Sequence, residues 1–175
     1  MQLLMRLLQS IFDFCKVFKR NLKILIMKEL TKFSIAVRES TLKRLRTVPK
    51  GSEDWRIDKD SMSFADIAQH IIDCDLALIE SFHTKNIGLN LGKAHSAMTD
   101  IYNALQGFIE KLEETKNKRA VFIEGLNQKD LSEIIAADRK DGKQQLTMEL
   151  LIYTMLDHET HHRGQLSVYL KMIGK

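Results

Sequence analysis

Residues 147–173 read TMELLIYTMLDHETHHRGQLSVYLKMI and predict a long helix that packs inside a bundle. Positions spaced alternately by three and four form one seam along this helix, typical of helix-on-helix packing. The members of the seam are Met148, Leu151, Met155, His158, His162, Gln165, Tyr169 and Met172. The three central members are polar, which is unfavourable in a buried seam unless they are paired or bound to something.

The spacing of His158 and His162 indicates a metal site. Residues four apart on a helix share a face, with their Cβ atoms about 5–6 Å apart. Both imidazoles can therefore reach one ion, but two ligands make an incomplete site. The sequence then predicts a third ligand on a neighbouring helix.

His70 is the candidate for that third ligand. It lies at the edge of an inward stripe with spacings of three and four that consists of Ile67, His70, Cys74 and Ala77. Three histidines from two helices, with positions left open for water or substrate, form the geometry of a catalytic metal site. Cys74, one turn further on, is either a fourth ligand or, as is commoner for a buried cysteine, a small hydrophobic residue.

The string from His158 to His162 also matches the zinc-protease motif H-E-x-x-H. Those proteases take a third ligand downstream, yet the 13 residues after His162 contain no Asp, Glu, His or Cys. This argues against a protease. Glu159 leaves the helix about 100° away from His158, which favours a supporting or surface role over that of a catalytic base.

Three further amphipathic helices are predicted upstream, which makes the fold all-α and the architecture a four-helix bundle. The first runs over 27–46 and stops before Pro49 and Gly51, and it is either separate from the preceding segment or continuous with it. The second begins at a Ser63 cap with Asp66 three residues on. The third covers 97–124 and is closed by Gly125, and a linker over 138–142 precedes the last helix.

Composition supports one mostly helical domain. The 175 residues are 44% hydrophobic and include one proline and eight glycines, too few turn-formers for a sandwich or a doubly wound sheet. Two cysteines, Cys15 and Cys74, indicate reduced thiols and a cytoplasmic location.

Residues 1–26 form a separate region with five basic side chains and one acidic, which accounts for the whole net charge of +4. The domain over 27–175 is thus balanced, so no nucleic-acid partner is expected. The extension is amphipathic but has no apolar run long enough to span a bilayer. It is an interfacial helix, a helix packed on the domain or a partner, or an upstream start before Met27. Packing or an upstream start is favoured over membrane binding, because amphipathicity is common to all surface helices.

The same residues carry a resemblance to a known family. His158 to Leu166 (HETHHRGQL), followed by Tyr169-Leu170 and Gly174, resembles the C-terminal signature of the DinB/YfiT-like family. Trp55 and Ser61 to Phe64, with His70 deeper in the helix, are similar to its first metal-ligand region. The similarity covers roughly 27–174 and leaves residues 1–26 without a counterpart.

The resemblance implies a four-helix bundle, in many members a homodimer, with a divalent metal, often zinc or nickel, held by His70, His158 and His162. It implies a metal-dependent enzyme acting on a small molecule, either a hydrolase or an S-transferase using a low-molecular-weight thiol such as bacillithiol or mycothiol. The alternative is a non-catalytic metal-binding or interaction module of the same fold. No catalytic residue is assigned.

Two residues beside the ligands are candidates for cofactor binding. Gln165 lies on the seam and either hydrogen-bonds a bound water or ligand imidazole or is a satisfied buried amide. Arg163 either binds a cofactor carboxylate or forms a surface ion pair.

Overall fold

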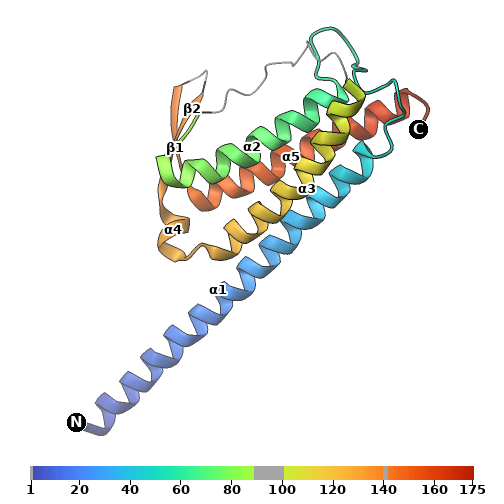
Figure 1. Ribbon diagram of the computed structural model, residues 1–175. Coiled ribbons are helices and arrows are strands. Elements are labelled where there is room, and N and C mark those ends of the chain that lie inside the picture. The colour runs from blue at the N-terminus through green and yellow to red at the C-terminus, as the bar shows by residue number, and fades with distance from the viewer. Residues whose placement is uncertain (1, 89–100, 140–141) are drawn as a thin grey trace.

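The computed structural model describes residues 2–88, 101–139 and 142–175 and confirms an all-α four-helix bundle (Figure 1). Its long helices are α1 (Gln2–Leu45), α2 (Phe64–Thr84), α3 (Ile101–Gly125) and α5 (Met148–Met172). Helices α1 and α2 each pack against both α3 and α5, so the four are arranged as a ring around one core. A short helix, α4 (Gln128–Ser132), follows α3.

The helix ends follow the expected capping chemistry. Ser63 Oγ accepts a hydrogen bond from the Asp66 amide, and the Asp66 carboxylate accepts one from the Ser63 amide, which forms a capping box at the start of α2. At the start of α5, Oγ1 of Thr147 accepts a hydrogen bond from the Leu150 amide, without a reciprocal bond. Residues 97–100, where the third helix was expected to begin, lie outside the described residues.

The buried apolar side chains form two clusters, one toward each end of the bundle, whereas Met172, predicted to lie on the inward seam, and two other large apolar side chains are exposed. Phe33, Val121 and Met172 are 54%, 72% and 55% exposed. Polar side chains take the inward positions beside two of them, Ser34 next to Phe33 and Arg119 near Val121, at 1% exposure each. An apolar stripe chosen by hydrophobicity alone was therefore wrong at these positions.

The segment predicted as a linker is a small sheet. Strands β2 (Ile134–Arg139) and β3 (Gly142–Thr147) pair antiparallel, and β1 (Asn86–Ile87) adds to β2 in parallel. The side chains of Ile87, Ile135 and Ala137 are buried and belong to the same apolar cluster as residues of α2 and α5. The sheet closes the end of the bundle beside α4 (Figure 1).

Helix α1 is continuous and extends far past the other helices (Figure 1). Every described side chain from Met5 to Phe18 is exposed, and among the side chains of α1 that the structure describes, Met27 is the first that is buried. An extension folded back onto the domain is thus excluded for these residues. No helix of the described part of the chain is both long and apolar enough to cross a membrane.

Candidate metal centre

The structure brings the three predicted histidines together between α2 and α5. Nε2 of His70 lies 3.3 Å from Nε2 of His158, which in turn lies 3.1 Å from Nε2 of His162. The His70 and His162 rings are also close, with centroids 4.8 Å apart. His70 and His162 are buried and His158 is half-buried, so this histidine cluster is reached from solvent at His158.

The histidine cluster is held in its neutral form. Burial, followed by repulsion from His158, lowers the pKa of both His70 and His162 to about 4. Burial also lowers the pKa of His158, aided by the neighbouring His161. A neutral imidazole is the form that binds metal ions, so these nitrogens have free lone pairs at neutral pH.

Gln165 fixes the orientation of one imidazole. The Nδ1–H group of His162 donates to Oε1 of Gln165 over 2.6 Å. Because the proton is on Nδ1, Nε2 of His162 presents its lone pair to the other two rings. Gln165 therefore contacts one of the three predicted ligand imidazoles.

Arg163 and His161 lie outside the histidine cluster. Among the described residues, no hydrogen bond or ion pair of the Arg163 guanidinium joins it to the histidines, and the side chain is half-buried. His161 is exposed and touches only the edge of the His162 ring among the histidines, with centroids 5.3 Å apart. The expected cofactor role of Arg163 stays a prediction.

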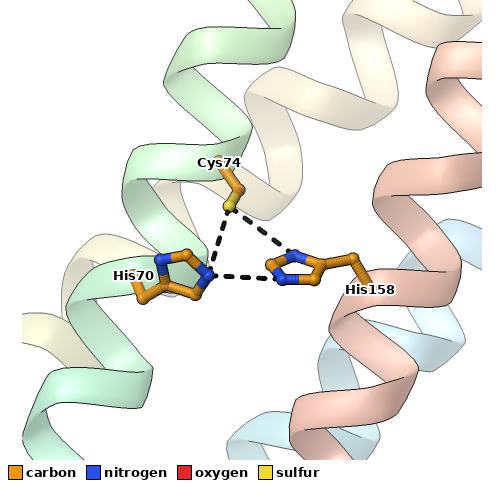
Figure 2. Close-up of side chains that lie close together, drawn as sticks. All are labelled: His70, Cys74 and His158. Carbon is orange, nitrogen blue, oxygen red and sulfur yellow. Dashed lines mark hydrogen bonds between the residues drawn. The ribbon is translucent and has the colours of Figure 1, made fainter. Parts of the chain in front are cut away.

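The sulfur of Cys74 is a further potential metal ligand beside the histidine cluster. Figure 2 shows it with His70 and His158. The sulfur lies 3.8 Å from Nε2 of His70 and 3.7 Å from Nδ1 of His158. With those two histidines it forms a group whose ligand atoms all lie within 4.8 Å of one another. Burial, reinforced by nearby carboxylates, raises the pKa of the thiol to about 12.

A buried charge network adjoins the histidine cluster, and sequence analysis missed most of it. Each of the four long helices contributes one member: Arg38, Asp75, Arg119 and Glu159. Arg38 bonds Glu159 and Asp75 over 2.7 Å each, and Arg119 bonds the same carboxylates over 2.6 and 2.8 Å. All four side chains are at most 3% exposed. We call them the arginine–carboxylate network.

The remaining donors of the arginine–carboxylate network are also satisfied. Arg38 donates further to the Leu112 carbonyl and Thr115, while Arg119 donates to the hydroxyl and carbonyl of Ser34. Although burial opposes ionisation, attraction and hydrogen bonds from both arginines lower the pKa of Glu159 to about 2. The carboxylate is thus charged and fully occupied, which rules it out as a free base.

The arginine–carboxylate network fixes the two helices that carry the site. Glu159 directly follows His158, and Asp75 directly follows Cys74. Bonds from both arginines to both carboxylates therefore hold α2 and α5 in register next to the candidate ligands. The sequence contained a signal of this network. In α1 the polar residues Ser34, Arg38 and Thr41 are spaced by four and three and so share one helix face.

Comparison with known proteins gives one family and several similar structures. The model of the DinB family matches residues 19–175. YfiT from Bacillus subtilis, described as a probable metal-dependent hydrolase with an unusual four-helix bundle topology, has 15% identity and a TM-score of 0.71, with 85% of this chain and 87% of that chain covered.

Two DinB-like proteins are also similar. For YjoA from Bacillus subtilis the identity is 20% and the TM-score 0.59, with 84% of this chain and 93% of that chain covered. For a protein from Bacillus cereus the values are 20% and 0.56, with 79% and 86% covered. No curated protein matches this chain.

Proposed function

This chain belongs to the DinB family, and from that premise we propose that it is a metal-dependent enzyme whose ligands are His70, His158 and His162. The approach of Nε2 of His158 to Nε2 of His70 and to Nε2 of His162, over 3.3 and 3.1 Å, carries the proposal. Metal–nitrogen bonds of about 2.0–2.1 Å in a tetrahedral site place ligand nitrogens roughly 3.3 Å apart. The residues therefore fit a divalent ion, with zinc or nickel as the candidates.

The protein's part in such a reaction is to hold the ligands rigid and unprotonated. Gln165 orients the His162 ring through its Nδ1–H group, and the arginine–carboxylate network fixes α2 against α5. The partial exposure of His158 leaves an approach for a small substrate. When bound, a divalent ion lowers the pKa of a coordinated water or thiol and polarises a substrate oxygen.

Hydrolysis of a small molecule is the reaction that we propose. YfiT is described as a probable metal-dependent hydrolase, and together with its matching fold this supports the hydrolase class for the present chain. Transfer of a small thiol is the alternative, since a metal that activates water also activates a thiol. Arg163 is the cofactor-binding residue proposed for that alternative, and a homodimer is proposed for the assembly.

Metal content tests the ligand set. We expect near-stoichiometric metal, measured by mass spectrometry, in the tag-free parent protein and its loss in the His70→Ala, His158→Ala and His162→Ala variants. His161→Ala is the matched control, because this imidazole lies on the same helix but outside the histidine cluster. A folded parent that stays metal-free after incubation with zinc and nickel would refute the proposal.

Activity of the metal-loaded protein tests the reaction class. Ester and amide hydrolysis that disappears in His162→Ala and needs no added thiol would support the hydrolase. Turnover only with a low-molecular-weight thiol would support the transferase instead. Stoichiometric metal with neither activity would favour a non-catalytic metal-binding module.

A further inference from the structure

The thiol of Cys74 lies beside two of the three imidazoles of the histidine cluster, those of His70 and His158. Cys74 follows His70 by four residues, so both side chains leave the same face of α2. Figure 2 shows the sulfur and the two imidazoles of His70 and His158 pointing toward one region between the helices. The side chain is 5% exposed, which leaves no room for bulk water beside it.

The distances fit a mixed nitrogen and sulfur site. With metal–nitrogen bonds of about 2.0–2.1 Å and a metal–sulfur bond of about 2.3 Å, a tetrahedral site separates nitrogen from sulfur by roughly 3.6 Å. The sulfur of Cys74 lies 3.8 Å from Nε2 of His70. Its contact with His158 is to Nδ1, so ligation requires a small rotation of the Cys74 or His158 side chain.

Charge balance favours a thiolate at this place. The arginine–carboxylate network has two guanidinium groups and two carboxylates, and both carboxylates are saturated by both arginines. It therefore offers no net negative charge to a dication held by neutral imidazoles. The other carboxylates that act on these imidazoles, Asp73 and Asp157, are exposed to solvent. Uncompensated charge in a mostly buried site is costly, and one thiolate would halve it.

We propose that Cys74 is a metal ligand, so that the centre has three histidines and one cysteine. The inference rests on the proposed function, because it needs the three histidines to bind the ion first. The sulfur gives up its proton to solvent as the bond to the metal forms. A thiolate also selects zinc or cobalt over manganese or magnesium.

Cobalt binding to the full-length metal-free protein tests this ligand. Thiolate bound to Co²⁺ gives a charge-transfer absorption band in the near ultraviolet, whereas histidine ligands give only weaker visible bands. We expect the ultraviolet band in the parent and in Cys15→Ser, and its loss in Cys74→Ser and Cys74→Ala. Cys15 is the matched control, because it is the other cysteine of the chain and is exposed on α1.

The outcomes separate the two proposals. Visible bands in Cys74→Ser without the ultraviolet band, with zinc affinity about 10- to 100-fold lower, would establish the sulfur ligand. An unchanged cobalt spectrum and zinc affinity in Cys74→Ser would overturn this inference and leave the three-histidine site intact. No cobalt binding by the parent would instead refute the proposed function. Far-ultraviolet circular dichroism of both Cys74 variants confirms that they are folded.

Discussion

Glu159 illustrates how this protein uses single residues to support its candidate metal centre. The residue before it, His158, faces the other imidazoles, while Glu159 turns into the bundle and binds two arginines from two other helices. Buried charges of this kind are tolerated only when every partner is present. The residue next to a ligand thereby becomes part of the scaffold that holds that ligand.

Removal of the Glu159 charge should destabilise the protein severely. In Glu159→Gln, Arg38 and Arg119 keep only Asp75 as a carboxylate partner, and we expect the free energy of unfolding to fall by about 3–5 kcal/mol. Urea denaturation of the metal-free protein measures this. The control is Glu113→Gln, which breaks the partly exposed pairs with Arg46 and Lys116 and should cost no more than about 1 kcal/mol. Similar midpoints for both variants would contradict the scaffold role.

The histidine cluster makes the stability of the metal-free protein depend on pH. The pKa values of His70 and His162 are lowered to about 4, so the unfolded chain binds more protons than the folded one between about pH 6.5 and pH 4. Stability should therefore be complete above pH 6.5 and fall as the pH drops through this window. The slope approaches about 1.4 kcal/mol per pH unit for each histidine. Urea midpoints across the window measure it, and a His70→Ala/His162→Ala double variant should show a shallower slope.

Gln165 should tune metal affinity without touching the ion. Gln165→Leu removes the acceptor of the His162 Nδ1–H group, and we expect zinc affinity to fall about 10- to 100-fold. Competition with a coloured chelator measures the change. Gln165→Glu keeps an acceptor oxygen and should retain tight binding. Equal affinities for all three proteins would show that Gln165 is an ordinary buried amide.

At the scale of elements, the sequence was most informative where a local pattern determines local structure. The Ser63 cap with Asp66, the Pro49–Gly51 stop and the Thr147 start of α5 all depend on neighbours within a few residues, and all three are present. The hairpin of β2 and β3 was missed because the segment around Asp138 and Gly142 was interpreted as a linker. Strand β1 was missed because it has two residues, and its pairing, such as Asn86 with Ala136, joins residues far apart in sequence.

The same distinction explains what could be foreseen of the site. His158 and His162 share one helix face, so their spacing alone indicated a metal site. The inward stripe of the second helix supplied His70, which the resemblance also implied. The arginine–carboxylate network depends instead on four helices meeting at one level. No spacing within one helix shows that Arg38 and Arg119 share the carboxylates of Asp75 and Glu159.

The capping box of α2 gives a prediction at this scale. Ser63→Ala leaves the Asp66 amide without its acceptor at a buried helix start, and we expect a loss of about 1 kcal/mol in the free energy of unfolding. Thermal or urea denaturation measures it. Ser63→Thr and Ser63→Asp keep an acceptor oxygen and should lose less. A larger loss in Ser63→Asp than in Ser63→Ala would mean that space, not hydrogen bonding, governs this position.

At the scale of the whole molecule, the bundle is complete without the first part of α1. Among the side chains of α1 that the structure describes, those buried against the other helices begin at Met27. The earlier turns carry exposed apolar side chains on a projecting rod (Figure 1).

Deletion of residues before Met27 should therefore leave stability unchanged. We expect the free energy of unfolding of the shortened protein, measured by urea denaturation, to lie within about 0.5 kcal/mol of that of the full chain, because surface changes rarely exceed this amount. The control is Leu30→Ala, which removes a buried side chain of the same helix and should cost about 2–5 kcal/mol. A comparable loss on deletion would show that the extension packs on the domain.

The length of α1 also bears on how the size of the particle is measured. A helix of 44 residues spans about 66 Å, much of it beyond the other helices. A rod of this kind increases friction far more than mass, so a single chain of 20.2 kDa will elute early from a sizing column and tumble slowly for its weight. Hydrodynamic radius alone would then suggest a dimer where there is one chain. Light scattering or native mass spectrometry, which weigh the particle directly, are the methods by which the proposed homodimer should be judged.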